Sequence, residues 1–562
     1  MNRATMMPRP AEVAALPPRA AAAPVRPGVI VAALLVALGV LIHGEMLSFE
    51  IIGFDGYPML ESARVRSAAD FAAIFTMPLM RGEYFAQGFF RPVHDLFFAL
   101  GYAYFGAAPA GQQLVTMAVF AASILLMWRA TRRMLGGTWA GPLAATMIYL
   151  LHPAQIAILP ITNQRHDLLA VTFLLATLAA LPLPGEHRRI GRLLLAGFFS
   201  WAAAGSKEIG VIAVGLTVLH QFFFSPAPPG RMRRVAGAML AAIPSAAGVA
   251  IYLVNRWLVL GGAGGYHTED RLVSQFARFA PVYLRDALNP IRGIGEGGRA
   301  GTLAAEGALL VLVLLACGAG WRRPNVADGT EMSFTFIRAR GRFALIAIGT
   351  LWIISNLVLA SLSYVPYFRY AMVLMTGFSL IVAAGVDAAA ALRRSVAASV
   401  GFAAAATLFF FMCRESPAWS DFPEFRYASR MQAAYLWRVS GKLDMARPGD
   451  TVVETLVSTI APNKSREATM LQTQSVLAWR RLNYPTRRDW RDRSPGPRPY
   501  EIQLEVAPTE GSALVERAGG YELPRTLSPE EIEAGRPQTR PASSAPSRVP
   551  RKGSGKGSIR NE

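Results

Sequence analysis

Long apolar stretches separated by short polar segments make up the first 412 residues of the chain. The stretches are apolar all round, so no polar helix face is visible, and many approach the roughly 20 residues that cross a bilayer. We therefore predict an all-α polytopic membrane domain, residues 29–412, with about eleven transmembrane helices. The predicted spans are residues 29–47, 112–128, 139–159, 167–183, 191–205, 209–224, 235–256, 303–321, 343–363, 367–386 and 396–412.

Arginine clusters occur in every second loop between these spans. Cytoplasmic loops are enriched in Lys and Arg, so the clusters assign their loops to the cytoplasm. They also explain the net charge of +20 without a nucleic-acid partner. The clusters are Arg129, Arg132 and Arg133; Arg188, Arg189 and Arg192; Arg231, Arg233 and Arg234; Arg322, Arg323, Arg338, Arg340 and Arg342; and Arg393 and Arg394.

The alternation requires residues 89–106 to lie on the membrane instead of crossing it. This segment reads FFRPVHDLFFALGYAYFG, and its polar residues predict an interfacial helix within an outer loop of residues 48–111. Residues 1–28, rich in Ala, Pro and Arg, are then a disordered cytoplasmic N-terminus. A cleaved signal peptide is the alternative, but no A-x-A-like cleavage site follows the first apolar run.

Composition changes after the last predicted span. Hydrophobic residues are 52% of the whole chain and charged residues only 17%, which excludes a soluble protein. Residues 413–525 nevertheless have an ordinary soluble composition and predict a small extracytoplasmic α/β domain, followed by a disordered basic tail, 526–562. Its expected helices are 424–443 and 465–482, and its expected strands are 451–457 and 500–506. A further short helix is expected at 271–288, within the Gly-rich outer loop 257–302.

The two cysteines, Cys317 and Cys413, are predicted at opposite membrane faces, so we expect no disulfide between them.

Polar residues that stand out against the apolar blocks are all predicted on the non-cytoplasmic side. An ionisable group at membrane depth is costly and is a functional candidate for that reason. Each also has a structural explanation: a loop carboxylate, an ion pair, a helix cap or a side chain that reaches lipid phosphate. Together they place carboxylates and cations on one face, which suits an anionic lipid-linked substrate and acid–base chemistry. The set is Asp55, His152, Arg165, His166, Asp167, Lys207, Glu208 and Arg369.

Five strings in this order resemble the GT-C integral-membrane glycosyltransferases that use polyprenyl-phosphate sugars. They are FDGY (54–57), FRPVHDLFFALGYAYFG (90–106), HPAQIAILPITNQRHDLLAVTFLLA (152–176), GSKEIGVIAVGLTVL (205–219) and FRYAMVLMTGFSLIVAAG (368–385). The nearest types are the protein O-mannosyltransferases and their tetratricopeptide-linked membrane relatives, although no such repeat is evident here. The resemblance implies an inverting hexosyltransferase in a bacterial inner membrane, with its active site facing the periplasm.

The resemblance also implies roles for individual residues. Asp55 matches the catalytic aspartate, which would act as general base on an acceptor hydroxyl. Lys207 and Arg369 match cations that would hold the lipid phosphate, and Arg91 matches the arginine of the surface-helix motif. Asp167 matches a second acidic position that binds substrate or a divalent metal. We group Arg165 and Glu208 with these substrate-binding residues.

A metal requirement stays open at this stage. Relatives often carry two adjacent acidic residues in the first outer loop, whereas Gly56 follows Asp55 here. No cofactor is therefore assigned, and Asp167, His152 and His166 are the candidates for a divalent metal.

Two other functions fit a polytopic protein. A lipid or glycan transporter, or flippase, would have polar residues near mid-membrane and repeated halves, and no repeat is visible. A non-catalytic scaffold for the 413–525 domain would have no use for the clustered polar set. The expected partners are a polyprenyl-phosphate sugar donor, membrane lipid and an acceptor that is a protein, a lipid or a glycan.

Overall fold

The computed structural model describes the membrane domain in several stretches. They are residues 27–53, 55–82, 88–184, 186, 189–225, 230–262, 264, 272–290, 298–321, 334–361, 368–392 and 395–416, with separate short stretches between 425 and 526. The predictions for residues 1–26 and for the tail after residue 526 lie outside the described residues.

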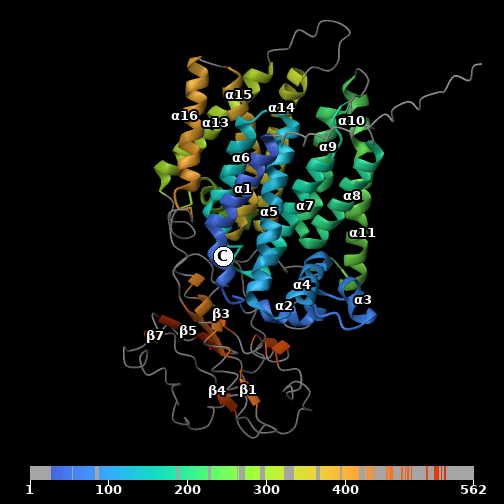
Figure 1. The fold of residues 1–562 in the computed structure, drawn as a ribbon, viewed down its shortest axis with the longest axis vertical. Helices are drawn as coiled ribbons and strands as arrows, with labels where there is room; N and C mark the ends of the chain where they lie inside the picture. The colour runs from blue at the N-terminus through green and yellow to red at the C-terminus, as the bar shows by residue number, and fades with distance from the viewer. Residues whose placement is uncertain are drawn as a thin grey trace, which may run out of the picture.

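Roughly parallel helices form one bundle (Figure 1). They are α1 (Pro27–His43), α5 (Pro109–Met134), α6 (Ala140–Leu151), α7 (Arg165–Ala180), α8 (Arg189–Ser206), α9 (Ala213–Phe224), α10 (Arg231–Ala241), α11 (Ile243–Leu260), α13 (Arg299–Trp321), α14 (Phe334–Ser361), α15 (Arg369–Ala391) and α16 (Val396–Cys413). Every predicted apolar block falls on these helices. Within the described residues, 7 helices are long and apolar enough to cross a membrane, and two shorter apolar helices accompany them. The chain is a multi-pass integral membrane protein with an all-α membrane domain.

Prolines shorten or divide two of the predicted helices. The block at 139–159 is helical only to Leu151, because Pro153 cannot continue the ladder and disfavours helical geometry at the residue before it. The block at 235–256 is divided between α10 and α11 at Ala242, and Pro244 occupies the first turn of α11.

Helix α15 lies at the centre of the bundle. Its apolar window is 100% buried, and it packs against α6, α13, α14 and α16. At its contact with α14, a Cβ placed on Gly349 would come within 2.6 Å of the Gly377 carbonyl oxygen. The small residues therefore let the two helix backbones approach closely, as is common between membrane helices.

Short helices cover one end of the bundle, which we call the α4 end. Figure 1 shows α2 (Gly56–Ser62), α3 (Ala68–Thr76) and α4 (Pro92–Phe105) together there. Helix α4 matches the predicted interfacial segment and is not among the helices apolar enough to span. The expected helix at 271–288 is α12 (Leu272–Leu288), which packs on α14 and α15. The remaining short turns are η1 (Gly44–Ser48), η2 (Leu79–Gly82), η3 (Pro153–Gln155), η4 (Thr162–Gln164) and η5 (Glu208–Ile212).

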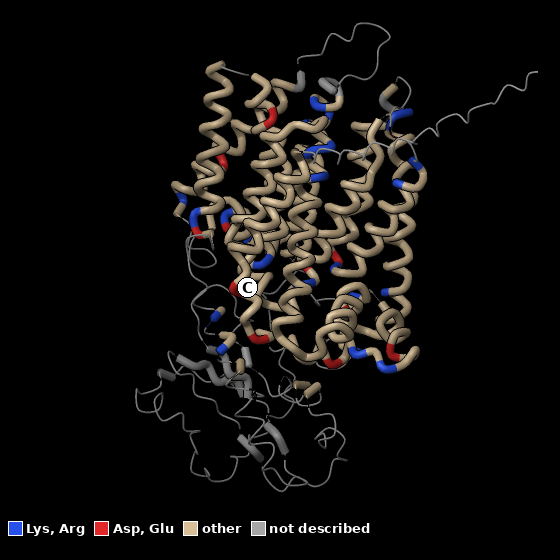
Figure 2. Tube along the Cα trace, in the orientation of Figure 1, with Lys and Arg blue, Asp and Glu red and all other residues tan. Residues whose placement is uncertain are grey.

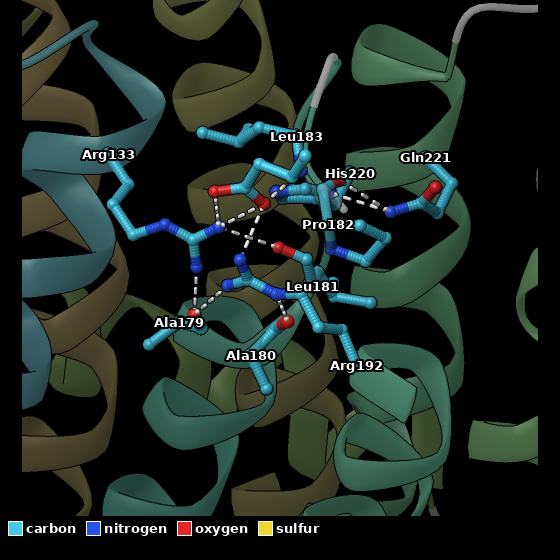
Figure 3. A network of polar contacts seen from close by, with 10 residues as sticks. Arg133, Ala179, Ala180, Leu181, Pro182, Leu183, Arg192, His220 and Gln221 are labelled. Carbon is cyan, nitrogen blue, oxygen red and sulfur yellow. Dashed lines mark hydrogen bonds and ion pairs between the residues drawn. The ribbon is translucent and has the colours of Figure 1, made fainter. Parts of the chain in front are cut away.

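The opposite end, which we call the arginine end, is held by ion pairs that are partly or fully buried. Glu186 accepts hydrogen bonds from Arg133 and Arg192, and the same arginines donate to carbonyls at the end of α7 (Figure 3). Asp387 at the end of α15 pairs in the same way with Arg338 and Arg342, at 2.8 Å each. Figure 2 shows basic residues gathered at this end of the bundle. Members of three predicted cytoplasmic clusters thus meet at one end, as the loop alternation requires.

The strands after the bundle lie beyond its α4 end (Figure 1). The predicted strand 451–457 is two strands in different sheets: β1 (Thr451–Val453) pairs in parallel with β4 (Glu501–Gln503), and β2 (Thr455–Thr459) pairs antiparallel with β5 (Ser512–Arg517). The other strands are β3 (Met470–Leu471), β6 (Gly520–Tyr521) and β7 (Arg525–Thr526). The helix predicted over 465–482 is wrong at β3, where pairing with Val457 and Ser458 of β2 overrides the local pattern.

Contacts join this C-terminal part to the α4 end. Arg426 pairs with Glu45 at 2.6 Å, and the Ser429 hydroxyl accepts a hydrogen bond from the Glu50 amide. Leu436 and Trp479 belong to the same apolar cluster as Tyr57 of α2. The segment after α16 therefore folds against the loop that contains Asp55. Cys317 is half-buried and Cys413 is buried, both as free thiols.

Candidate functional site

A cavity of about 320 Å³ lies between the residues just before α4, the first turn of α7, the η5 turn and helices α11, α14 and α15. These six elements are spread along the sequence, and each contributes residues at the α4 end of the bundle. The cavity is lined by Phe89, Arg91, Asp167, Lys207, Glu208, Ile209, Val211, Tyr252, Leu253, Arg256, Gly264, Asn356, Leu359, Ala360, Tyr370 and Val373.

Lys207 and Asp167 form a buried ion pair in this cavity. The Lys207 ammonium donates to Asp167 Oδ1, and His166 Nε2 lies 3.2 Å from Asp167 Oδ2. Lys207 follows directly after α8, which ends at Ser206, and its backbone is extended before η5 begins. Both partners have side chains that are 7% exposed or less, so each charge depends on the other for its stabilisation.

Glu208 faces two arginines instead of one lysine. Its Oε2 lies 3.1 Å from Arg91 Nη2, and its Oε1 lies 3.1 Å from Arg256 Nη1. Both guanidinium groups are oriented by aromatic residues: Arg91 lies over the Phe89 ring at 4.8 Å, and Arg256 donates to the Tyr252 hydroxyl at 3.1 Å. The adjacent residues 207 and 208 thus belong to two separate ionic clusters.

An aromatic residue completes the polar wall. The Lys207 ammonium lies 4.8 Å from the centre of the Tyr370 ring, and the Arg369 guanidinium lies 5.4 Å from the same ring. Tyr283 of α12 contacts the Tyr370 ring edge-on, with the ring centres 5.7 Å apart. Helix α12 therefore supports the cavity wall from outside the bundle.

The remaining wall is apolar and reaches the surface of the bundle. Leu253 lines the cavity, yet it is 46% exposed. Its helix, α11, has only 28% of its apolar window buried and therefore faces lipid. The cavity thus combines fixed charges with an apolar side next to the bilayer.

Four of the predicted site residues line this cavity: Arg91, Asp167, Lys207 and Glu208. Arg369 is next to it, through Tyr370.

Asp55 is not among the lining residues. It is half-buried immediately before α2, and a Cβ on the neighbouring Gly56 would lie 3.4 Å from Thr162 Oγ1 in η4. The η4 turn leads directly to Asp167, so the Asp55 loop is attached to the segment that carries the cavity carboxylate. Burial also raises the pKa of the nearby Glu50, which accepts a hydrogen bond from Tyr57.

Arg165 does not line the cavity, and its side chain binds neighbouring helices instead. Its Nε donates to Thr116 Oγ1 at 3.0 Å, its Nη2 donates to the Gln112 carbonyl at 2.7 Å, and its guanidinium lies over the Phe98 ring at 4.7 Å. These contacts join the start of α7 to α4 and α5.

The three residues predicted as possible metal ligands do not lie together. His152 is fully buried, with Nε2 at 2.9 Å from the Ala287 carbonyl and Nδ1 accepting from the Ala154 amide, so both ring nitrogens are used. His166 and Asp167 remain together. Within the described residues, no group of three His, Cys, Asp or Glu side chains is placed to hold a metal ion.

Sequence reasoning missed Arg256 and Tyr252. A signal for Arg256 was available, because it lies at the non-cytoplasmic end of a predicted span, away from the arginine-rich loops.

No protein-family model and no curated protein matches the chain. Among solved structures, it is similar to the archaeal oligosaccharyltransferase AglB from Archaeoglobus fulgidus in complex with an inhibitory peptide and a dolichol-phosphate. That match has a TM-score of 0.43 and 14% identity, and covers 74% of this chain and 59% of that chain. It is also similar to ArnT from Cupriavidus metallidurans bound to undecaprenyl phosphate, with a TM-score of 0.28, 16% identity, and coverage of 64% and 77%.

These neighbours are membrane glycosyltransferases of the GT-C type, the class that the sequence resembles. The chain spans less than two thirds of the length of the oligosaccharyltransferase structure. Likeness at this level concerns the arrangement of helices, and it assigns a role to no residue.

Proposed function

We propose that this protein is a membrane glycosyltransferase that moves a sugar from a polyprenyl-phosphate donor to a hydroxyl acceptor. The observation that carries the proposal is the cavity itself. It places Arg91, Lys207 and Arg256 beside an apolar wall that ends at the lipid-facing Leu253. An anionic head group on a long apolar chain matches both parts of this cavity.

The cations would act on the leaving phosphate. The acceptor oxygen forms a bond to the anomeric carbon of the sugar while the bond from that carbon to the phosphate oxygen breaks. The electron pair leaves with the phosphate, and the configuration of the sugar is inverted. Lys207, with Arg369 nearby, would offset the charge that develops on that phosphate, and such preorganised electrostatic stabilisation is usually the largest catalytic term.

Asp55 is our candidate for the general base that takes the proton of the acceptor hydroxyl. Its support is its position at the α4 end, in a loop attached to the η4 turn that precedes Asp167. A positioned base of this kind contributes about 10²–10⁴-fold to the rate.

We place the reaction on the extracytoplasmic side, which is the periplasm if the membrane is a bacterial inner membrane. The support is the arginine end, because clusters of this kind mark the cytoplasmic side and the cavity lies at the other end.

The test is transfer of radiolabelled sugar by the purified chain in liposomes that contain a polyprenyl-phosphate sugar. We expect transfer to a hydroxyl acceptor with release of polyprenyl phosphate, and slower transfer by the Lys207→Ala variant. Lys207→Ala should weaken use of the donor more than use of the acceptor. Movement of intact donor between leaflets, without release of polyprenyl phosphate, would replace the transferase with a flippase.

A further inference from the structure

Glu208 lies between two arginines, and this arrangement indicates a phosphate site made by a pair of arginines and not by single cations. Glu208 uses both carboxylate oxygens, one on Arg91 and one on Arg256, at 3.1 Å each. Two guanidinium groups that converge on one pair of oxygens form a fork that suits a phosphate as well as a carboxylate.

Exposure differs sharply between the anion and the cations. The Glu208 side chain is 30% exposed, whereas those of Arg91 and Arg256 are 7% and 8% exposed. Aromatic residues also hold both arginines in place. Arg91 lies over the Phe89 ring, and Arg256 donates to the Tyr252 hydroxyl. That hydroxyl donates in turn to the Phe90 carbonyl at 3.2 Å. The carboxylate is therefore the member that is able to leave without dismantling the site.

The charges in the cavity also favour displacement of Glu208 by an anion. In this cavity Lys207 and Asp167 pair with each other, while Arg91 and Arg256 share the single carboxylate of Glu208. Among the described residues that line the cavity, three are cations and two are carboxylates. An incoming anion that displaces Glu208 meets two preoriented guanidinium groups.

We propose that Arg91 and Arg256 form a phosphate subsite that Glu208 occupies in the ligand-free protein and vacates when the phosphate of a lipid enters. The proposal rests on the proposed function for the lipid nature of the ligand. It gives Arg256 a binding role and makes Glu208 a competitor of the ligand instead of a contact to it. The apolar wall beside the pair, including Leu253 and Val211, favours a lipid phosphate over a free one.

The opposite end of the bundle supplies a matched control. Glu186 also accepts from two arginines, Arg133 and Arg192, which Figure 3 labels. The Glu186 side chain is also 30% exposed. It does not line the cavity. Glu186→Gln therefore removes the same kind of bridge at a position where no effect on the subsite is expected.

Binding of undecaprenyl phosphate to the purified full chain in detergent tests the proposal without any sugar transfer. We expect Glu208→Gln to lower the Kd by about 3–10-fold and Arg256→Gln to raise it by about 10-fold or more, because a charge-assisted hydrogen bond is lost. Glu186→Gln should leave the Kd unchanged. A Glu208→Gln variant that binds undecaprenyl phosphate more weakly than the wild type would overturn the competitor role. An unchanged Kd in Arg256→Gln would remove that arginine from the subsite.

Inorganic phosphate is the second arm. We expect it to bind far more weakly than undecaprenyl phosphate, because it leaves the apolar wall empty; equal affinity would overturn the lipid assignment. The melting temperature without ligand checks that each variant is folded. The Kd is then taken from the rise in melting temperature that the ligand causes. If transfer fails in liposomes while these Kd changes appear, the proposed function is wrong and the subsite stands. If transfer occurs but these Kd changes do not appear, the subsite is wrong and the proposed function stands.

Discussion

The Lys207 ammonium donates a hydrogen bond to the Asp167 carboxylate from a position 40 residues further along the chain. The pair joins the last residue before η5 to the first turn of α7, inside the cavity. Its burial makes the two charges interdependent, and that dependence is measurable.

Removal of one charge should be more damaging than removal of both. Asp167→Asn or Lys207→Gln alone leaves an uncompensated buried charge and should cost about 3–5 kcal/mol of stability, whereas the double variant should cost less than the sum of the two. A double-mutant cycle on the melting of the detergent-solubilised protein checks this. Additive losses would mean that the two groups are not coupled.

Asp55→Asn should abolish sugar transfer without lowering expression. The reason is that an amide cannot take the proton of the acceptor hydroxyl, while its size is unchanged. The matched control is Asp70→Asn in α3, whose carboxylate binds Arg81 at 2.8 Å in the same outer loop. That control should reduce thermal stability and retain transfer. Full transfer by the Asp55→Asn variant would discard the general-base assignment.

Asp95 in the first turn of α4 should make stability depend on pH. Burial raises the pKa of Asp95 from 3.8 to about 8, although Arg91 and Arg81 act in the opposite direction. The folded protein therefore holds a proton that the unfolded chain releases, so this contribution to stability is full below pH 3.8 and is lost as the pH rises to about 8. Asp95→Asn should remove the dependence, and its melting temperature should exceed that of the wild type increasingly from pH 5 to pH 8. A constant difference across that range would show that Asp95 is ionised in the folded state.

Gly210→Ala should disturb the turn that presents Lys207 and Glu208. A Cβ at Gly210 would lie 2.1–2.3 Å from backbone atoms of Ala203 and Ala204, which cannot move aside as a side chain can. We expect a lower melting temperature and weaker binding of undecaprenyl phosphate. Gly191→Ala in α8 is the control, because no atom lies within 4 Å of its Cβ position and alanine favours the helix by about 1 kcal/mol. Equal melting temperatures for the two variants would mean that the turn accommodates the methyl group.

The bundle was predictable from sequence because apolar length and arginine position are local properties. Hydropathy located each of the candidate spans that the structure describes, and the loop clusters identified the ends that meet around Glu186 and Asp387. Proline effects on α6 and α11 were also visible in principle, at Pro153 and Pro244.

The different roles of Arg165 and Asp167 were not predictable in the same way. Arg165 and Asp167 are two positions apart on a helix, so their side chains point in different directions, and only one of them can line a given cavity. Which one does so depends on the neighbours, here Thr116 of α5 for Arg165 and Lys207 for Asp167. The position of Arg256 at the non-cytoplasmic end of a predicted span marked it as unusual, but nothing in the sequence links it to Glu208, which is 48 residues earlier.

Enclosure of α15 limits how a lipid could reach Tyr370. That helix has no bilayer-facing side, whereas Leu253 on α11 opens one flank of the cavity to the surrounding acyl chains. A long isoprenoid would thus arrive by two-dimensional diffusion within a leaflet. Occupancy of the cavity would then follow the mole fraction of the isoprenoid among the lipids. Apparent affinities measured at different lipid-to-protein ratios should therefore agree only when they are expressed as mole fractions.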